Sequence, residues 1–147
     1  MPSGARRTST FTAMEATAMT FDTTSSNVNA LEITRNLLHA ADTDIARFFG
    51  FFSTDCIFRM GNNDPVQGSE AIQQWVASYL GSVAGMHHVI LEQWCDGNLA
   101  ALHVNVTYTM NNGTSFTLPA VTRTRVENGK VAEYLIFMDP SPVLAAR

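Results

Sequence analysis

The chain has 147 residues, of which 46% are hydrophobic and only 15% are charged, and its formal net charge is −4. This length suits one domain with its own core, and the low share of charged residues predicts that a second subunit covers part of the apolar surface. No stripe of lysine and arginine alternates with aromatic residues, which excludes the usual pattern of a nucleic-acid or anionic-membrane binder. No apolar run reaches the ~18 residues that a membrane-spanning helix needs. We therefore expect a cytoplasmic protein that binds neither nucleic acid nor membrane.

The two cysteines and the first 25 residues carry little functional information. Cys56 and Cys95 match no metal-ligand spacing, which predicts reduced thiols rather than a disulfide or a zinc site. Residues 1–25 are rich in Ser, Thr, Ala and Met but lack the continuous apolar stretch of a secretory signal. They are interpreted as a mobile tail, or as a start assigned too early given Met14 and Met19, with a transit peptide as a further alternative. The folded domain is predicted over residues 26–147.

Helical periodicity predicts two helices at the beginning of this domain. From about Ser26 to Ala41 the apolar residues recur on one helical face, and Asp42 or Thr43 is placed to cap a second helix. The second helix carries an apolar stripe at positions i, i+3, i+4 and i+7, formed by Ile45, Phe48, Phe49 and Phe52. This stripe is interpreted as core rather than as a ligand site.

A short strand and a third helix come next. Residues 56–60 predict the strand, and the turn-forming run 61–65 (GNNDP) ends it. The third helix follows Gly68, and its apolar face is formed by Ala71, Ile72, Trp75, Val76, Tyr79, Leu80 and Val83.

The last part of the chain predicts four strands, over residues 87–95, 99–110, 115–126 and 131–138. They are rich in β-branched and aromatic residues and are separated by DGN, NNG and ENG. Asn and Gly tolerate the positive φ of tight turns, so the three separators indicate hairpins and an antiparallel meander. Helices precede strands without βαβ alternation, which predicts an α+β fold.

This order of elements resembles the SnoaL-like branch of the nuclear transport factor 2-like (NTF2-like, cystatin-like) superfamily. FRMGN at 58–62 and PVQGSEAI at 65–72 are similar to the family's first strand and the loop that enters its third helix. WCDGN at 94–98 and RVENGKV at 125–131 are similar to its first and last hairpins, and FMDPSP at 137–142 is similar to the acidic ending of many members. The resemblance covers about residues 29–144.

The resemblance implies a cone in which three helices pack on a strongly curved antiparallel sheet and enclose an apolar pocket. The family includes ketosteroid isomerases, polyketide cyclases, scytalone dehydratases and limonene-type epoxide hydrolases, which are mostly cofactor-free. The isomerase's basic carboxylate falls at Met60, its oxyanion-hole acid near Thr122 and its first-helix tyrosine near Asn36, so that chemistry is not expected. The epoxide hydrolase's last-strand aspartate falls near Ile136, and its Arg-x-Asp pair is replaced by His103-Val104-Asn105. The cyclase-like branch remains.

Two residues are the first candidates for acid–base chemistry. His87 and His88 point to opposite faces of a strand, and the resemblance favours His88 as the pocket-facing base near neutral pH. Asp139 follows an apolar strand and precedes two prolines. It is predicted either to orient a histidine or transfer a proton, or to accept backbone N–H groups in the C-terminal turn.

Strand parity leaves the remaining candidates open. If the apolar set of strand 99–110 faces the pocket, Tyr108 is the proton donor there and His103 lies on the outer face; the reverse register makes His103-x-Asn105 the polar site. Asn62 is predicted to bind a carbonyl oxygen or to stabilise its turn. The expected pocket lining consists of Asn36, Phe58, Met60, Trp75, Tyr79, Thr122, Tyr134, Ile136 and Met138.

The sequence contains no Gly-rich phosphate loop, no serine nucleophile elbow and no metal-ligand pair, so no cofactor or metal is expected. The leading prediction is a cofactor-independent enzyme that isomerises, cyclises, dehydrates or hydrolyses a hydrophobic, cyclic molecule such as a polyketide, terpenoid or steroid. Asp139, His88, Tyr108, Asn62 and His103 are its candidate catalytic residues. The alternatives are a non-catalytic small-molecule-binding module with the same pocket and a structural dimer subunit. A homodimer through the outer face of the sheet is predicted in each case.

Overall fold

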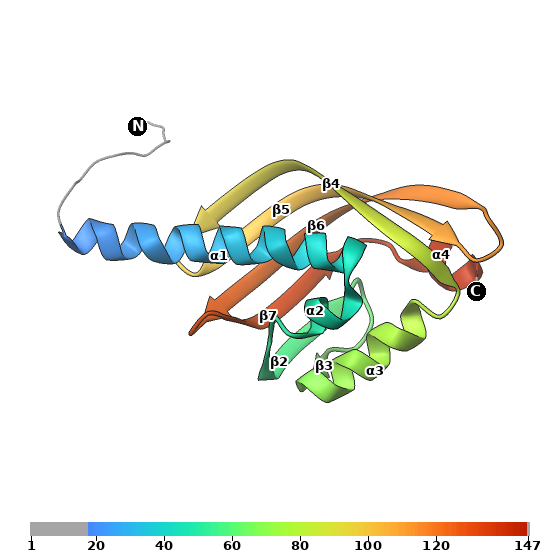
Figure 1. The fold of residues 1–147 in the computed structure, drawn as a ribbon, viewed down its shortest axis with the longest axis horizontal. Helices are drawn as coiled ribbons and strands as arrows, with labels where there is room; N and C mark the ends of the chain where they lie inside the picture. Colours follow the sequence, from blue (N-terminus) through green and yellow to red (C-terminus); the bar gives the residue numbers. More distant parts are fainter. Residues whose placement is uncertain (1–17, 147) are drawn as a thin grey trace.

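The computed structural model describes residues 18–146, with side chains from Ala30 onward. The elements are α1 (Ala18–Thr43), α2 (Ile45–Phe49), β2 (Phe52–Met60), β3 (Val66–Gln67), α3 (Ser69–Tyr79), β4 (Val83–Asp96), β5 (Leu99–Met110), β6 (Ser115–Glu127), β7 (Lys130–Phe137) and α4 (Ser141–Ala146). This is the predicted α+β order, and Figure 1 shows the helices and the single bent sheet. The interpretation of residues 1–17 lies outside the described residues.

The six strands form one sheet in the order β3-β2-β7-β6-β5-β4. The four late strands make the predicted antiparallel meander, whereas β2 joins its end by pairing parallel to β7. The ladder between β4 and β5 shifts register between Ile90 and Glu92, which leaves Leu91 unpaired. A bulge of this kind bends and twists a strand, so it contributes to the curvature that makes one face concave.

Helix α1 packs against β4, β5 and β6, and α3 packs against β2 and β3, so the helices cover the concave face (Figure 1). In α1, Ala30, Thr34, Leu37 and Leu38 recur at helical spacing and are all buried. The Thr34 hydroxyl donates to the Ala30 carbonyl oxygen and lies 2.6 Å from the Thr124 hydroxyl. Because a hydroxyl has one hydrogen, Thr124 donates the second bond, which ties α1 to β6.

Several boundaries differ from the sequence prediction for local reasons. Helix α1 begins at Ala18 and continues to Thr43, so Asp42 is inside it and Asp44 caps α2 by accepting the Arg47 backbone N–H at 3.2 Å. Phe52 belongs to β2 rather than to the second helix. Val83 starts β4 instead of ending α3. Strand β3 and helix α4 were not predicted, because two residues of strand and one turn of helix carry no periodicity.

Candidate active site

The concave face settles which residues of β4 and β5 point inward. His88 pairs with Val106 in the β4–β5 ladder, and Val106 and Tyr108 are both buried. His87 points the other way, and its side chain is 73% exposed. The apolar set of β5 therefore faces the interior, as the first of the two registers predicted, and His103 lies on the outer face, where its Nδ1 is 3.0 Å from Glu92 Oε1.

The interior contains a small apolar cavity, called here the inner cavity, of about 50 Å³. It is far smaller than the open cone that the sequence predicted, because aromatic side chains fill most of the space. Trp75 stacks on Tyr79, and Phe58 packs edge-on against Tyr134. The lining consists of Ala41, Ile45, Phe48, Phe58, Met60, Trp75, Val76, Tyr79, Leu80, Met86, His88, Tyr108, Tyr134 and Ile136.

One wall of the inner cavity is an aspartate–histidine pair. Asp42, in the last turn of α1, accepts the His88 backbone N–H through Oδ2 at 2.8 Å, and its Oδ1 lies 2.6 Å from His88 Nδ1. Both side chains are nearly buried, with 11% and 12% exposed. Because a carboxylate can only accept, the proton of a neutral imidazole is on Nδ1 and Nε2 keeps its lone pair. Asp42 thus fixes the tautomer that makes His88 Nε2 a base.

Tyr79 and Tyr108 provide hydroxyl groups in the same cavity. Their oxygens are 3.0 Å apart, one from α3 and the other from β5. Burial raises the pKa of Tyr108, with the hydrogen bond from Tyr79 opposing the shift, so Tyr108 stays protonated at neutral pH. His88 faces Val106 across the ladder, which makes Tyr108 its diagonal neighbour at a Cα separation of about 7–8 Å. A reacting group between them contacts a base on one side and a donor on the other.

Tyr134 and Cys56 are buried titratable groups with different environments. Burial raises the pKa of Tyr134 above its ordinary value, and the hydrogen bond with Thr122 opposes that shift. Burial also raises the pKa of the Cys56 thiol to about 12, so it is not a thiolate nucleophile at neutral pH. Cys56 and Cys95 form no disulfide.

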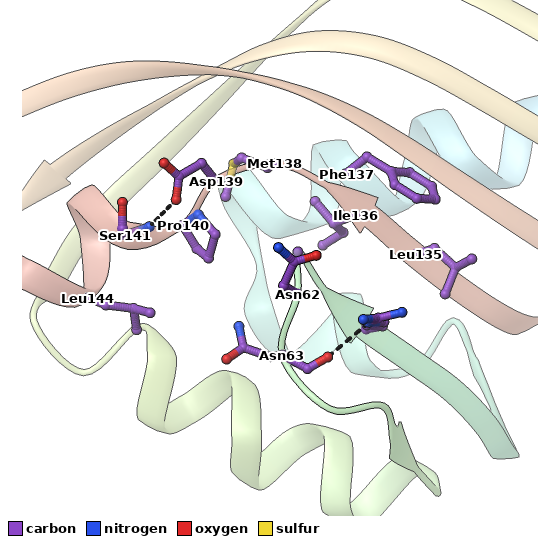
Figure 2. A pocket seen from close by; sticks show the side chains of 12 residues that line it. Asn62, Asn63, Leu135, Ile136, Phe137, Met138, Asp139, Pro140, Ser141 and Leu144 are labelled. Carbon is purple, nitrogen blue, oxygen red and sulfur yellow. Dashed lines mark hydrogen bonds between the residues drawn. The ribbon is translucent and has the colours of Figure 1, made fainter.

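Two of the predicted catalytic residues lie elsewhere, in an open groove of about 580 Å³ between the 61–63 turn, the end of β7 and α4, called here the outer groove. Figure 2 shows Asn62 and Asp139 among its lining residues. Gly61 makes this turn possible: its φ is +56°, and a Cβ there would lie 2.7 Å from the Met138 carbonyl oxygen.

Asp139 is fully exposed and accepts the Ser141 backbone N–H at 3.0 Å, which is the structural alternative considered for it (Figure 2). That hydrogen bond lowers its pKa, which weakens it as a base. The structure therefore does not bring Asp139 or Asn62 together with His88. Neither does it bring Asn36 inward, since Asn36 is exposed on α1 beside a groove that also contains His39 and His87.

The other predicted pocket residues divide between the two sites. Six of them line the inner cavity, namely Phe58, Met60, Trp75, Tyr79, Tyr134 and Ile136. Thr122 is buried beside it, and Met138 lines the outer groove. The sequence analysis missed Asp42 as a functional residue, because its pairing with His88 spans 46 positions and its place before α2 suggested a cap.

Comparison with known proteins supports the fold. A sequence model of the SnoaL-like domain matches residues 35–134. The chain belongs to the SnoaL-like domain family. No curated protein sequence matches it.

Three solved structures illustrate the similarity of this SnoaL-like protein to others. A protein of Jannaschia sp. CCS1 classed with the SnoaL-like polyketide cyclases has a TM-score of 0.72 at 15% identity, over 91% of this chain and 96% of that one. An epoxide hydrolase of the LEH-like type from M. tuberculosis has a TM-score of 0.69 at 12% identity, over 81% and 89%. A Catenulispora acidiphila protein with a ketosteroid isomerase-like fold, in complex with trimethylamine, has a TM-score of 0.67 at 20% identity, over 78% and 90%. At these identities the likeness establishes the fold.

None of the helices within residues 18–146 is long and apolar enough to cross a membrane. In the same range, no three His, Cys, Asp or Glu side chains are grouped to hold a metal ion.

Proposed function

We propose that this SnoaL-like protein is a cofactor-independent enzyme that moves a proton on a hydrophobic small molecule, with His88 as the general base. The observation that carries the proposal is the bond between Asp42 Oδ1 and His88 Nδ1, because it leaves the basic Nε2 of a nearly buried imidazole at an apolar cavity. A base and a donor in such surroundings act with little screening by water.

The chemical step follows from these positions. Nε2 of His88 takes a proton from a carbon next to a carbonyl group, and the electron pair of the C–H bond moves onto the carbonyl oxygen. Tyr108 donates a hydrogen bond to that oxygen as negative charge develops, and the Tyr79 hydroxyl lies within hydrogen-bonding distance of Tyr108. The imidazolium, stabilised by Asp42, then returns its proton to another atom of the same molecule. Isomerisation results if that atom is a carbon, and dehydration results if it is a leaving hydroxyl.

The comparisons support this proposal at the level of the class. Neighbours of the same fold include an epoxide hydrolase and a protein classed with polyketide cyclases, and one neighbour is in complex with trimethylamine. They support a small-molecule ligand in a fold of this kind. We place the chemistry in the inner cavity rather than at Asp139 and Asn62, because the outer groove leaves its carboxylate in water.

Deuterium exchange tests the proposal without knowledge of the natural substrate. Methyl nonyl ketone incubated with the protein in D₂O is expected to lose its α-protons, followed by NMR, faster than with an equal concentration of imidazole. The His88→Gln variant is expected to lose this acceleration. If His88→Gln exchanges the α-protons as fast as the native chain, His88 is not the base. Binding without exchange would favour the non-catalytic module instead.

The homodimer stays a prediction and concerns the other face of the sheet. Val89, Trp94 and Phe137 are large apolar side chains of the sheet that are exposed to between 46% and 60%. Burying such side chains against a second copy removes apolar surface from water. Sedimentation at micromolar concentration is expected to give a dimer, and Phe137→Lys is expected to shift it towards the monomer. A native chain that sediments as a monomer would contradict the prediction.

A further inference from the structure

The inner cavity has a larger neighbour from which it is separated by a thin wall. A groove of about 420 Å³, called here the mouth groove, lies between the end of α1, α2, the last turns of α3 and the start of β4. Five residues line both spaces, namely Ala41, Ile45, Val76, Leu80 and Met86. We call these five residues the dividing wall. One layer of side chains therefore separates the two spaces.

Part of the dividing wall is carried by backbone that makes few constraints on its side chains. Ile45 begins a helix of only five residues and is 42% exposed. Met86 follows a register shift in the β4–β5 ladder, between Val83 and Gly85, which leaves Ala84 unpaired. Methionine is unbranched and rotates readily. Rotation of Ile45 and Met86 joins the two spaces without breaking a hydrogen bond of the sheet.

The size of the inner cavity limits what it can hold. At about 50 Å³ it has room for a small group, whereas ligand sites in proteins usually have about 300–1,000 Å³. The mouth groove alone falls in that range. A ligand that reaches His88 and Tyr108 must therefore be elongated, with its reacting end in the inner cavity and most of its length in the mouth groove.

The charges of the mouth groove limit what its outer end can be. Asp42 and Asp44 are the only charged residues among those that line it. Of the nearby cations, Arg35 lines a different groove, and Arg47 lies over the Phe51 ring, 5.3 Å from its centroid. A carboxylate or phosphate at the outer end would face two carboxylates without a compensating cation, which disfavours binding at low salt.

We propose that the inner cavity and the mouth groove form one ligand site, divided in this structure by Ile45 and Met86, for an elongated apolar molecule without negative charge at its outer end. The proposal rests on the proposed function only for the role of His88 and Tyr108 at the inner end. It departs from a bulky polycyclic substrate, because the polar groups lie beyond a narrow opening.

Fluorescence of Trp75, which lines the inner cavity, gives a direct binding signal. Trp94→Phe removes the second tryptophan, which is 51% exposed on the outer face. Three probes of equal length are compared: methyl nonyl ketone and its analogues that end in a carboxylate or a trimethylammonium group. The neutral and cationic probes are expected to bind, and the carboxylate probe is expected to bind at least about tenfold more weakly, a gap that narrows as salt is added.

Two sets of variants test the charge and the wall. Asp44→Asn keeps a good helix cap but removes a charge, so it should reduce the discrimination against the carboxylate probe, whereas Asp96→Asn at the far end of β4 should not. Met86→Ala should speed association of the neutral ketone at least about fivefold, because a larger fraction of molecules is open. Met138→Ala, in the outer groove, is the matched control. Ile45→Ala is the second wall variant if Met86→Ala does not fold.

The results separate this inference from the proposed function. Equal affinity for the carboxylate and neutral probes, no binding of the ketone, or association rates unchanged by both wall variants would overturn the inference. The expected binding pattern together with α-proton exchange that is insensitive to His88→Gln would support the inference and overturn the proposed function. Exchange that depends on His88 without discrimination between the probes would do the reverse.

Discussion

The inner cavity and the outer groove each contain an aspartate beside a hydrogen-bond donor, and the two aspartates differ in what surrounds them. Asp42 is nearly buried and holds an imidazole, whereas Asp139 is in water and holds the backbone N–H of Ser141. Water screens a charge and favours the ionised carboxylate, so Asp139 is a weak base, while Asp42 acts on His88 through a short bond in an apolar wall. Volume alone would favour the outer groove; the surroundings of the polar groups favour the inner cavity.

The largest expected effect that breaks this comparison is the loss of the histidine. His88→Gln should reduce α-proton exchange of methyl nonyl ketone by about 10²- to 10⁴-fold, the usual contribution of general base catalysis. His87→Gln is the matched control, since His87 is the neighbouring residue on the opposite, exposed face. NMR of the ketone in D₂O measures both. Equal losses in the two variants would mean that neither face is special.

Asp42→Asn should have the next largest effect. An amide can donate to Nδ1, which lets the imidazole adopt the other tautomer, and exchange is expected to fall by about ten- to a thousand-fold. The ¹⁵N shifts of the His88 ring should report the change of tautomer, which a purely structural role of Asp42 would not produce. Asp44→Asn, also beside α2, is the control for the loss of one charge. Unchanged ring shifts in Asp42→Asn would show that Asp42 does not position His88.

Tyr108→Phe should have a smaller effect on exchange, of about tenfold or more, because it removes the donor to the developing oxyanion. It also removes the bond to Tyr79, at a cost of about 1 kcal/mol in the free energy of unfolding. Thr109→Val on the opposite, exposed face of β5 is the control. If exchange falls only in proportion to the folded fraction, measured by urea denaturation, Tyr108 is structural.

The buried tyrosines and Cys56 predict how stability depends on pH. Their pKa values are raised in the folded chain, so folding retains protons that the unfolded chain releases. Stability is therefore constant with respect to these groups at neutral pH and falls above about pH 9, as the pH rises past their ordinary values. Urea midpoints between about pH 8 and pH 11 should decline, and Tyr134→Phe should flatten the decline. A profile unaffected by Tyr134→Phe would contradict the burial argument.

The smallest effect is expected in the outer groove. Asp139→Asn and Asn62→Ala should leave α-proton exchange unchanged within about twofold, because neither residue contacts the inner cavity. Both variants should keep the Trp75 signal of the bound ketone. A loss of exchange comparable to that of His88→Gln would move the site to the outer groove and reverse the comparison.

The elements of the fold could be predicted from sequence because each has a local signal. The hairpin separators and β-branched runs located the four late strands, and parity placed Tyr108 and His103 on opposite faces, although it could not say which face was inside. What settled the choice was the packing of α1 on the sheet. The parallel pairing of β2 with β7 has no local signature and was not predicted.

The site was only partly predictable for the same reason. His88, Tyr108 and most of the aromatic lining were identified, because alternation along one strand and spacing along one helix are local. Asp42 was not, because whether it caps a helix or holds an imidazole depends on where a strand 46 residues away passes. Asp139 was expected near the histidine from its position after an apolar strand, but the turn into α4 carries it to the outer groove.

The most direct measurement is a crystal structure of the protein with methyl nonyl ketone bound. The account predicts the carbonyl oxygen within hydrogen-bonding distance of the Tyr108 hydroxyl and an α-carbon beside Nε2 of His88, with the chain passing between Ile45 and Met86. A ketone bound beside Asn62 and Asp139, with His88 untouched, would contradict it.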